Sequence, residues 1–487
     1  MTDFPEKSAL EPDDWAVFRQ RAHETLDRAL DRLEQAGTGR VWSPVPKDVE
    51  LQLEQALAAA PLEADAVDAA LASLLPYGVG NTHPRFLGWV HGGGTPFGLL
   101  PAMIEAPINA NCGGRDHVGL KVERALTGWV AEQFGFPQTA SGLVVTGTSM
   151  ATVVALKVAR DAALGFASRE SGVDGSKLVA YTSAEAHACN ARALDILGLG
   201  SSSLRKVPVN GAFRIDLMAL KSAIDQDRAA GLVPFAVIGT AGTVNTGAID
   251  DLDGLAVIAE QEGLWFHVDG AFAASGILSD EVAPKLRGIE RAHSIAFDFH
   301  KWLHVNYDAG FVLVRDEELH RRTFSTRPDY LKAGERGLAA GNPWPVEFGP
   351  ELSRGFRALK VWAHIAEFGP QRLGTAITEN CHLVRTLAAL VDEVPSLERL
   401  APVETSICCF RYRAEGLTEL ELDALNEEIV VRLQETGVAA PSTTRVNGKL
   451  AIRVNITNHR TRAADLHMLL SAIGDLAPEA LQQFRHI

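Results

Sequence analysis

The chain has 487 residues, 46% of them hydrophobic, and no apolar run reaches the ~18 residues of a membrane span, so a soluble protein with a large core is expected. A formal net charge of −15 argues against nucleic acid and anionic membranes as partners, because both attract basic surfaces. Five cysteines are too few for a disulfide framework and the start lacks a secretion signal, which predicts a cytoplasmic protein acting on a small molecule.

The beginning of the chain is predicted to be helical. Apolar residues recur at helical spacing from Trp15 to Leu33, and Asp13 and Asp14 are well placed for the positive end of the helix dipole. A second helical pattern runs from residue 49 to residue 60. Residues 1–95 are therefore predicted to form an N-terminal helical segment.

Two glycine- and hydroxyl-rich stretches are candidate ligand contacts. The triple glycine 92–94 follows Trp89 and His91 and would let the backbone approach a ligand, although a plain surface loop is equally consistent with it. Residues 143–152 run from a strand into a helix through Thr146-Gly147-Thr148-Ser149. Free N–H groups and the helix dipole at such a turn suit a phosphate, but serine and threonine also cap helices for structural reasons alone.

Short apolar runs beginning at residues 143, 178, 235, 264, 294 and 310 are predicted strands, and helical patterns alternate with them. This predicts an α/β domain over residues 96–365 with a mostly parallel sheet covered on both faces, and a ligand site beyond the carboxyl ends of the strands. Residues 366–487 mix alternating strand patterns with a helical stripe, which indicates a small α+β domain. No G-x-G-x-x-G spacing occurs, so a dinucleotide-binding dehydrogenase is disfavoured.

Lys301 stands between two apolar strands, although lysine is rarely buried. A low-dielectric site favours the neutral amine, which can attack a carbonyl. Asp269 ends the preceding apolar strand. A lysine that holds an aldehyde as a Schiff base and an acid that keeps a pyridine nitrogen protonated are what a pyridoxal phosphate site requires.

With these residues in place, the chain resembles the group II pyridoxal-phosphate-dependent amino-acid decarboxylases, aromatic-L-amino-acid decarboxylases in particular. The signature is His300-Lys301-Trp302 followed by Val305-Asn306-Tyr307-Asp308. Further landmarks recur in order over roughly residues 80 to 365: His83-Pro84-Arg85-Phe86, Trp129, His187, Gly239 to Asp250 and the stretch Arg354 to Trp362. The resemblance implies the fold-type-I architecture of pyridoxal-phosphate-dependent transferases.

The resemblance also implies roles for individual residues. Lys301, Asp269 and His187 would be catalytic, with His187 stacked on the cofactor ring. Cofactor contacts would come from Thr148, Ser149, His187, Thr243, Asp269, Ala271, Asp298, His300 and Lys301. The substrate pocket would include Trp89, His91 and Gly92. The N-terminal helices would pack on a partner subunit in a homodimer, whereas the residue pattern alone is equally compatible with a helical layer on the chain's own domain.

Three departures from the family pattern bear on the reaction. Asp298 replaces a common asparagine near the cofactor phosphate, and Val244 replaces a common threonine. The resemblance places a carbanion-protonating tyrosine about ten residues before Arg354, where this chain has Pro343-Trp344-Pro345. His187 and Tyr330 are then candidate acids. Without protonation, reaction with oxygen would give an aldehyde instead of an amine.

Decarboxylation of an aromatic amino acid is therefore expected, with aldehyde formation and an acidic substrate, attracted by Arg115, as alternatives. An aminotransferase would more usually use an arginine for the α-carboxylate. A metallohydrolase is the alternative of another class, because His300 and His304 stand four apart, with Asp269 or Asp308 as a possible third ligand. No metal is expected under the preferred hypothesis.

Overall fold

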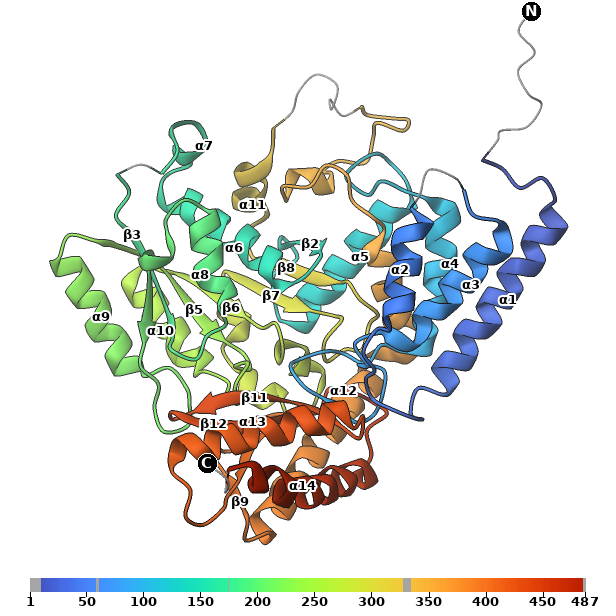
Figure 1. Cartoon of the computed structure of the whole chain (residues 1–487). Coiled ribbons are helices and arrows are strands. Elements are labelled where there is room, and N and C mark those ends of the chain that lie inside the picture. The colour runs from blue at the N-terminus through green and yellow to red at the C-terminus, as the bar shows by residue number, and fades with distance from the viewer. Residues whose placement is uncertain (1–9, 58–60, 174, 327–333, 485–487) are drawn as a thin grey trace, which may run out of the picture.

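The computed structural model describes residues 10–57, 61–173, 175–326 and 334–484. Within these ranges, a seven-stranded sheet forms the centre of the molecule (Figure 1). Only β8 runs antiparallel to its neighbours in this sheet, which confirms the mostly parallel arrangement. In spatial order the strands are β2 (Ser141–Val145), β8 (Gly310–Val314), β7 (Ser294–Asp298), β6 (Trp265–Asp269), β5 (Val233–Thr240), β3 (Leu178–Ser183) and β4 (Leu204–Val207).

Helices cover both faces of this sheet, because successive side chains of each strand point to opposite faces. Leu143 and Val145 of β2 pack with one helical layer, whereas Val144 packs with the other. The first layer contains α6 (Thr148–Ala163), α8 (Cys189–Ile196) and α11 (Glu317–Phe324). The second contains α5 (Val118–Gln133), α9 (Leu217–Ala229) and α10 (Leu252–Glu262). A single turn, α7 (Ser168–Ser171), follows α6.

A second, five-stranded sheet lies below the first in Figure 1. Its order is β1 (Phe86–Leu87), β11 (Ala440–Val446), β12 (Lys449–Asn455), β10 (Ile407–Tyr412) and β9 (Leu397–Arg399). The helices α12 (Arg357–Glu393), α13 (Glu419–Glu435) and α14 (Ala463–Phe484) pack on it. Strand β1, which belongs to the predicted N-terminal segment, pairs with β11 of this second sheet. Helix α12 runs across the predicted domain boundary at residue 365. The domain boundaries 1–95, 96–365 and 366–487 therefore stay predictions.

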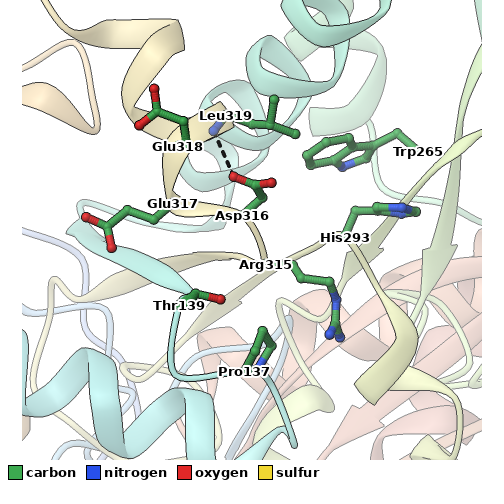
Figure 2. A pocket seen from close by; sticks show the side chains of 9 residues that line it. All are labelled: Pro137, Thr139, Trp265, His293, Arg315, Asp316, Glu317, Glu318 and Leu319. Atoms are coloured by element: carbon green, nitrogen blue, oxygen red, sulfur yellow. Dashed lines mark hydrogen bonds between the residues drawn. The ribbon is translucent and has the colours of Figure 1, made fainter.

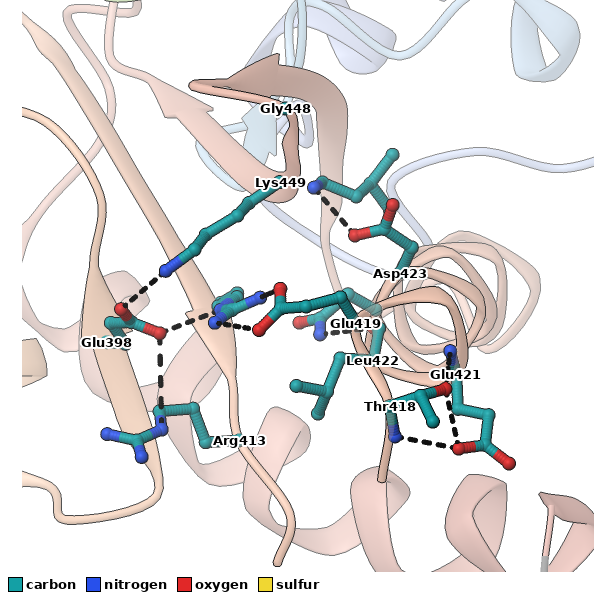
Figure 3. Close-up of polar contacts among 12 residues, drawn as sticks. Glu398, Arg413, Thr418, Glu419, Glu421, Leu422, Asp423, Gly448 and Lys449 are labelled. Atoms are coloured by element: carbon teal, nitrogen blue, oxygen red, sulfur yellow. Dashed lines mark hydrogen bonds and ion pairs between the residues drawn. The ribbon is translucent and has the colours of Figure 1, made fainter. Parts of the chain in front are cut away.

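A buried arginine organises the polar side of this small domain (Figure 3). Arg411 on β10 is 3% exposed, and its guanidinium contacts the Glu398 carboxylate at 2.7 Å and the Glu419 carboxylate at 2.6 Å. Lys449 reaches Glu398 from β12 at 3.3 Å. Burial would raise the pKa of Glu398, but hydrogen bonds from Arg411 and Lys449 outweigh burial and lower it. These contacts hold β9, β10, β12 and α13 together.

The predicted N-terminal helix is confirmed as α1 (Trp15–Glu34), with Asp14 as its N-cap. It is followed by α2 (Lys47–Ala56), α3 (Ala64–Leu74) and α4 (Leu99–Ile108), which lie with α1 along one flank of the molecule (Figure 1). No side chain of α1 is buried, and Trp15 is 58% exposed. None of the described helices is both long enough and apolar enough to cross a membrane.

One buried ion pair joins three segments of the large domain. The Glu123 carboxylate on α5 lies 2.6 Å from the Arg354 guanidinium, and each residue is 4% exposed. Glu123 also accepts a hydrogen bond from the Val144 N–H, and Arg354 donates to the carbonyls of Val144 and Cys112. The pair therefore fixes α5 and the Arg354 loop against β2. This strand leads to the turn at Thr148 that is predicted to suit a phosphate.

We expect Glu123→Ala to destabilise the protein by about 3–5 kcal/mol, because it leaves a buried guanidinium without a counter-charge. Urea unfolding followed by circular dichroism measures this loss. Asp392→Ala is the control: it removes the exposed pair with Arg399, and we expect a loss below about 1 kcal/mol. Equal losses in the two variants would contradict the importance of the buried pair.

Candidate active site

A cavity of about 520 Å³ opens at the carboxyl ends of the parallel strands. Strand register explains why, since Asp269 ends β6 beside Ala296 of β7, and Asp298 ends β7. Residues that are far apart in the sequence therefore meet at one edge of the sheet. The cavity is lined by Trp89, Val90, His91, Thr146, Gly147, Thr148, Ser149, Met150, His187, Cys189, Thr240, Gly242, Val244, Asp269, Ala271, Phe272, Asp298, His300, Lys301 and Tyr307.

Lys301 lies in the turn after β7 and forms an ion pair with Asp298. Its Nζ is 2.9 Å from Asp298 Oδ2, while Asp298 Oδ1 accepts the Thr148 N–H at 2.7 Å. Burial lowers the pKa of Lys301, but the Asp298 carboxylate more than compensates and holds that pKa above its ordinary value. The protein without cofactor therefore keeps this amine protonated, contrary to the expectation that burial alone would favour its neutral form.

The Asp269 carboxylate is held by the start of α8. Asn190 donates from Nδ2 to Asp269 Oδ2 at 3.1 Å, and the Ala271 N–H donates to Oδ1 at 3.3 Å. The Cys189 thiol lies 3.8 Å from the same Oδ2, and burial, followed by the charge of Asp269, raises the pKa of this thiol. A carboxylate that accepts two N–H groups at a strand end is suited to face a protonated ring nitrogen.

The turn after β2 fits a phosphate. Helix α6 begins at Thr148 and points its amino end into the cavity wall, where Gly147, Thr148 and Ser149 are lining residues. Thr148 Oγ1 is buried without a hydrogen-bond partner, so the turn offers an unused hydroxyl in addition to the helix dipole. Asp298 already takes the Thr148 N–H, which places a carboxylate beside the group that a phosphate would contact.

Two histidines line the cavity with fixed orientations. His187 Nδ1 accepts the Cys189 N–H at 3.2 Å, and His300 Nδ1 accepts the Ala309 N–H at 3.0 Å. The His300 ring also packs on the Tyr307 ring with centroids 4.2 Å apart. Burial lowers the pKa of His300, so its imidazole is neutral at physiological pH.

The predicted substrate-pocket residues form an aromatic wall. The His91 ring stacks on Phe86 at 5.6 Å and meets Tyr307 edge-on at 6.0 Å, while the half-exposed Trp89 ring lies 6.0 Å from His91. Gly92 does not itself line the cavity. A β-carbon at residue 92 would come within 2.2 Å of the His300 carbonyl oxygen and 2.4 Å of the Lys301 carbonyl oxygen, so glycine is required there.

Two predicted contacts are not found at the cavity. Thr243 hydrogen-bonds within its own loop: its hydroxyl lies 3.0 Å from the Thr246 hydroxyl and accepts the Ala248 N–H, while its neighbours Gly242 and Val244 line the cavity. The contact between Thr243 and the cofactor therefore stays a prediction, on a loop whose neighbouring residues line the cavity. Arg115 also lies outside the lining, with its guanidinium 4.9 Å from the centre of the Trp344 ring. Tyr330 lies outside the described residues.

Sequence reasoning missed several members of the site. Asn190, Cys189 and Tyr307 come close to the predicted residues, but nothing in their spacing distinguishes them from ordinary helix or loop positions. The signal for Asn190 is its position three residues after His187, which places it in the first turn of α8 beside the predicted site. Tyr307 belongs to the signature motif, but the motif alone does not indicate that its ring lines the cavity.

A larger cavity, of about 660 Å³, lies at the opposite ends of the same strands (Figure 2). Its polar side chains support the protein backbone: His293 accepts the Phe266 N–H at 2.9 Å, Arg315 donates to the Ala292 carbonyl at 2.8 Å, and Asp316 caps α11 through the Leu319 N–H at 3.0 Å. Because these side chains hydrogen-bond to the backbone, the cavity does not combine an amine, two carboxylates and a helix amino end as the cavity around Lys301 does. Size alone does not identify the active site.

The metallohydrolase alternative finds no support in the geometry. His300 lies in a turn and His304 in an irregular segment, so the two are not on one helix face. His304 is 2% exposed and does not line the cavity. Among the residues that the structure describes, no group of three or more histidine, cysteine, aspartate or glutamate side chains is arranged to hold a metal ion.

Residues 46–413 match the family model described as the pyridoxal-dependent decarboxylase conserved domain. An aromatic-L-amino-acid decarboxylase from Bacillus atrophaeus is 34% identical over 405 residues, covering 82% of each chain. A phenylacetaldehyde synthase from Arabidopsis thaliana is 28% identical over 92% of this chain and 93% of its own. The crystal structure of Oryza sativa TDC with PLP and tryptamine has a TM-score of 0.86 at 25% identity, covering 96% of this chain and 99% of that one.

The architecture is thus that of the pyridoxal-phosphate-dependent enzymes of fold type I, as predicted. The chain belongs to the pyridoxal-dependent decarboxylase family, so its cofactor is pyridoxal phosphate and its reaction is the decarboxylation of an amino acid.

Asp298→Asn should lower the pKa of Lys301, because burial would then act without the opposing carboxylate. Competitive acylation of the cofactor-free protein at a series of pH values, read by mass spectrometry of the Lys301 peptide, measures the midpoint. We expect a shift to lower pH. Asp308→Asn is the matched control, since Asp308 pairs with Arg357 and should leave the midpoint unchanged. An unmoved midpoint in Asp298→Asn would contradict the assigned cause.

Proposed function

We propose that the chain decarboxylates an aromatic L-amino acid to the corresponding amine and carbon dioxide. The observation that carries this proposal is the wall of Trp89, His91 and Tyr307 beside Lys301, which Phe86 backs from the core, because aromatic side chains pack on one another at these centroid distances. The aromatic-L-amino-acid decarboxylase from Bacillus atrophaeus supports the same substrate class by its similarity. An acidic substrate is disfavoured, since Arg115 is not a lining residue.

Lys301 is proposed to bind the cofactor aldehyde, and Asp269 to face the ring nitrogen. The first turn of α6, with Thr148 and Ser149, is proposed to bind the phosphate. Asp298 and His300, at the neighbouring strand end, are proposed as further cofactor contacts, with Asp298 holding Lys301 and the Thr148 N–H. Ala271 lines the ring site. These residues would hold pyridoxal phosphate, which would supply the electron-withdrawing ring that decarboxylation of the amino acid requires. His187 is proposed to lie against the cofactor ring, with its orientation fixed by the Cys189 N–H.

The residue that returns a proton to the product decides between two outcomes. Trp344, at the position where the resemblance placed a loop tyrosine, is 2% exposed and donates its indole N–H to the Ala340 carbonyl at 2.9 Å. The indole of Trp344 is not an acid that could protonate a carbanion. We therefore propose Tyr330, which precedes Trp344 in the sequence, as the proton donor, with His187 as the alternative.

Oxidative conversion to an aldehyde is the second candidate reaction, and similarity to the Arabidopsis thaliana phenylacetaldehyde synthase favours including it. In that reaction the amino acid, oxygen and water give an aldehyde, carbon dioxide, ammonia and hydrogen peroxide. The two candidate reactions therefore differ in measurable products.

A homodimer in the cytoplasm is also proposed. The apolar side chains of the N-terminal helices extend over α1, α3 and α4 without being buried in the chain's own core, and exposed patches of this kind are typical of interfaces. The members that carry this argument are Trp15, Phe18, Leu71, Leu100, Met103 and Ile104, each at least 45% exposed.

Lys301→Ala should abolish the visible absorbance of covalently bound cofactor and reduce decarboxylation by several orders of magnitude, because no other amine in the described cavity replaces it. Absorbance spectra and release of labelled carbon dioxide from a panel of amino acids test this. We expect the wild type to accept tryptophan, tyrosine or phenylalanine. Native turnover by Lys301→Ala would overturn the assignment of the lysine.

Wild-type protein should form amine in equal amount to carbon dioxide without peroxide. Tyr330→Phe should divert turnover to aldehyde, ammonia and peroxide, because the proton donor is removed while the electron-withdrawing cofactor remains. Quantifying all four products in one incubation provides the measurement, with Tyr412→Phe as a control on the small domain. Unchanged amine yield in Tyr330→Phe would transfer the proposed role to His187, and peroxide from the wild type would favour the oxidative reaction.

A further inference from the structure

We propose that Arg453 and Asn455, two residues of β12 in the small domain, are positioning residues for the substrate: they fix the backbone of Trp89 and thereby set where its indole ring lies at the cavity. This inference rests on the proposed function, because it takes the cavity around Lys301 as the site of the amino-acid substrate.

The backbone of Trp89 needs external support. Its φ is +47°, in the left-handed region that a residue with a β-carbon adopts only at a cost. Its ring is nevertheless 50% exposed and lines the cavity, so burial of the indole does not account for the conformation. The stabilising contacts must come from hydrogen bonds to the peptide groups on either side.

The small domain supplies those hydrogen bonds. The Trp89 carbonyl accepts from Arg453 Nη1 at 2.8 Å and from Asn455 Nδ2 at 2.7 Å. The Trp89 N–H donates to the Ser442 hydroxyl on β11 at 3.2 Å. Both peptide groups of the residue are therefore held from β11 and β12, which are neighbouring strands of the same sheet.

Arg453 joins this contact to a second part of the cavity wall. Its Nε donates to the Val244 carbonyl at 2.7 Å, and Val244 is a lining residue of the loop after β5. Arg453 is 2% exposed, and no salt bridge to a carboxylate holds it within the described part of the chain. A planar guanidinium can serve several carbonyls at once, which a lysine ammonium in the same place would not reproduce.

The same strand supports the next residues of the wall. Just beyond β12, the Thr457 hydroxyl donates to the His91 carbonyl at 2.8 Å. On the other side, Gly92 packs directly against the carbonyls of His300 and Lys301. The segment 89–92 is thus held between β12 and the lysine turn. A change at Arg453 should move the wall that receives the substrate side chain while leaving the lysine in place.

Arg453→Lys tests the proposal by steady-state kinetics. We expect KM for the preferred aromatic amino acid to rise about tenfold with kcat within about threefold of wild type, because the lost interaction acts on substrate binding. Arg411→Lys is the matched control: it makes the same change at a buried arginine on the adjacent strand β10, whose partners are Glu398 and Glu419 (Figure 3). KM should be unchanged in this control.

A second pair of variants separates positioning from direct substrate contact. In a Trp89→Ala background, Arg453→Lys should raise KM little further, because the residue through which it acts is gone. The same tenfold rise in both backgrounds would overturn the proposal in favour of a direct contact. Asn455→Ala should raise KM in the same direction as Arg453→Lys, which keeps the test available if the arginine variant fails to fold.

Acrylamide quenching of Trp89 gives a readout that does not depend on activity. The emission of Trp89 is taken as the difference between each protein and its Trp89→Phe version. We expect increased quenching in Arg453→Lys and Asn455→Ala and none in Arg411→Lys. Unchanged quenching in both β12 variants would overturn the positioning role. If the wild type accepts only non-aromatic amino acids, the proposed aromatic substrate is wrong, but the positioning role of Arg453 and Asn455 is not affected. The kinetic test then uses the amino acid that the wild type accepts.

Discussion

The ion pair between Lys301 and Asp298 is the interaction on which the arrangement of the site depends. One oxygen of the carboxylate lies 2.9 Å from the lysine amine, and the other accepts the first N–H of α6. A single side chain thus connects the amine proposed to bind an aldehyde to the helix end that suits a phosphate. Because a carboxylate and a phosphate favour the same positive environment, the helix dipole and Lys301 must together offset two anionic groups at this end of the cavity.

The position of Asp269, at the other end of the site, follows from the order of the strands. Strands β5, β6 and β7 are adjacent and parallel, with Thr240 paired to Asp269 and Asp269 paired to Ala296. The chain positions of these residues are therefore unimportant, because their strands end at one edge of the sheet. Asn190 then fixes the Asp269 carboxylate from the side. The acid at the end of β6 and the amine after β7 therefore line the same cavity.

The sequence was sufficient for the features that local patterns encode. Strands with small or acidic residues at their ends, the turn at Thr148 and the lysine motif follow from periodicity and residue chemistry, and the family resemblance assigned them roles. Contacts between distant segments could not be predicted, because no local rule connects Asn190 with Asp269 or Arg453 with Trp89. The loop around Thr243 marks a second limit: a loop can be recognised from its composition, but which of its side chains faces the cavity depends on its folded hydrogen bonds.

The two sheets support different parts of the proposed site. The large sheet supplies the groups proposed to bind the cofactor, which lie at or beyond the carboxyl ends of its parallel strands. The pocket wall at residues 89–91 comes from a segment that follows β1, and β1 pairs with β11 of the other sheet. Since β12 holds the carbonyl of Trp89, and Thr457 just beyond β12 holds that of His91, we expect a shift of the small domain to change the proposed substrate pocket more than the position of Lys301. Substrate preference can therefore vary through residues of the small domain while the chemistry at Lys301 is retained.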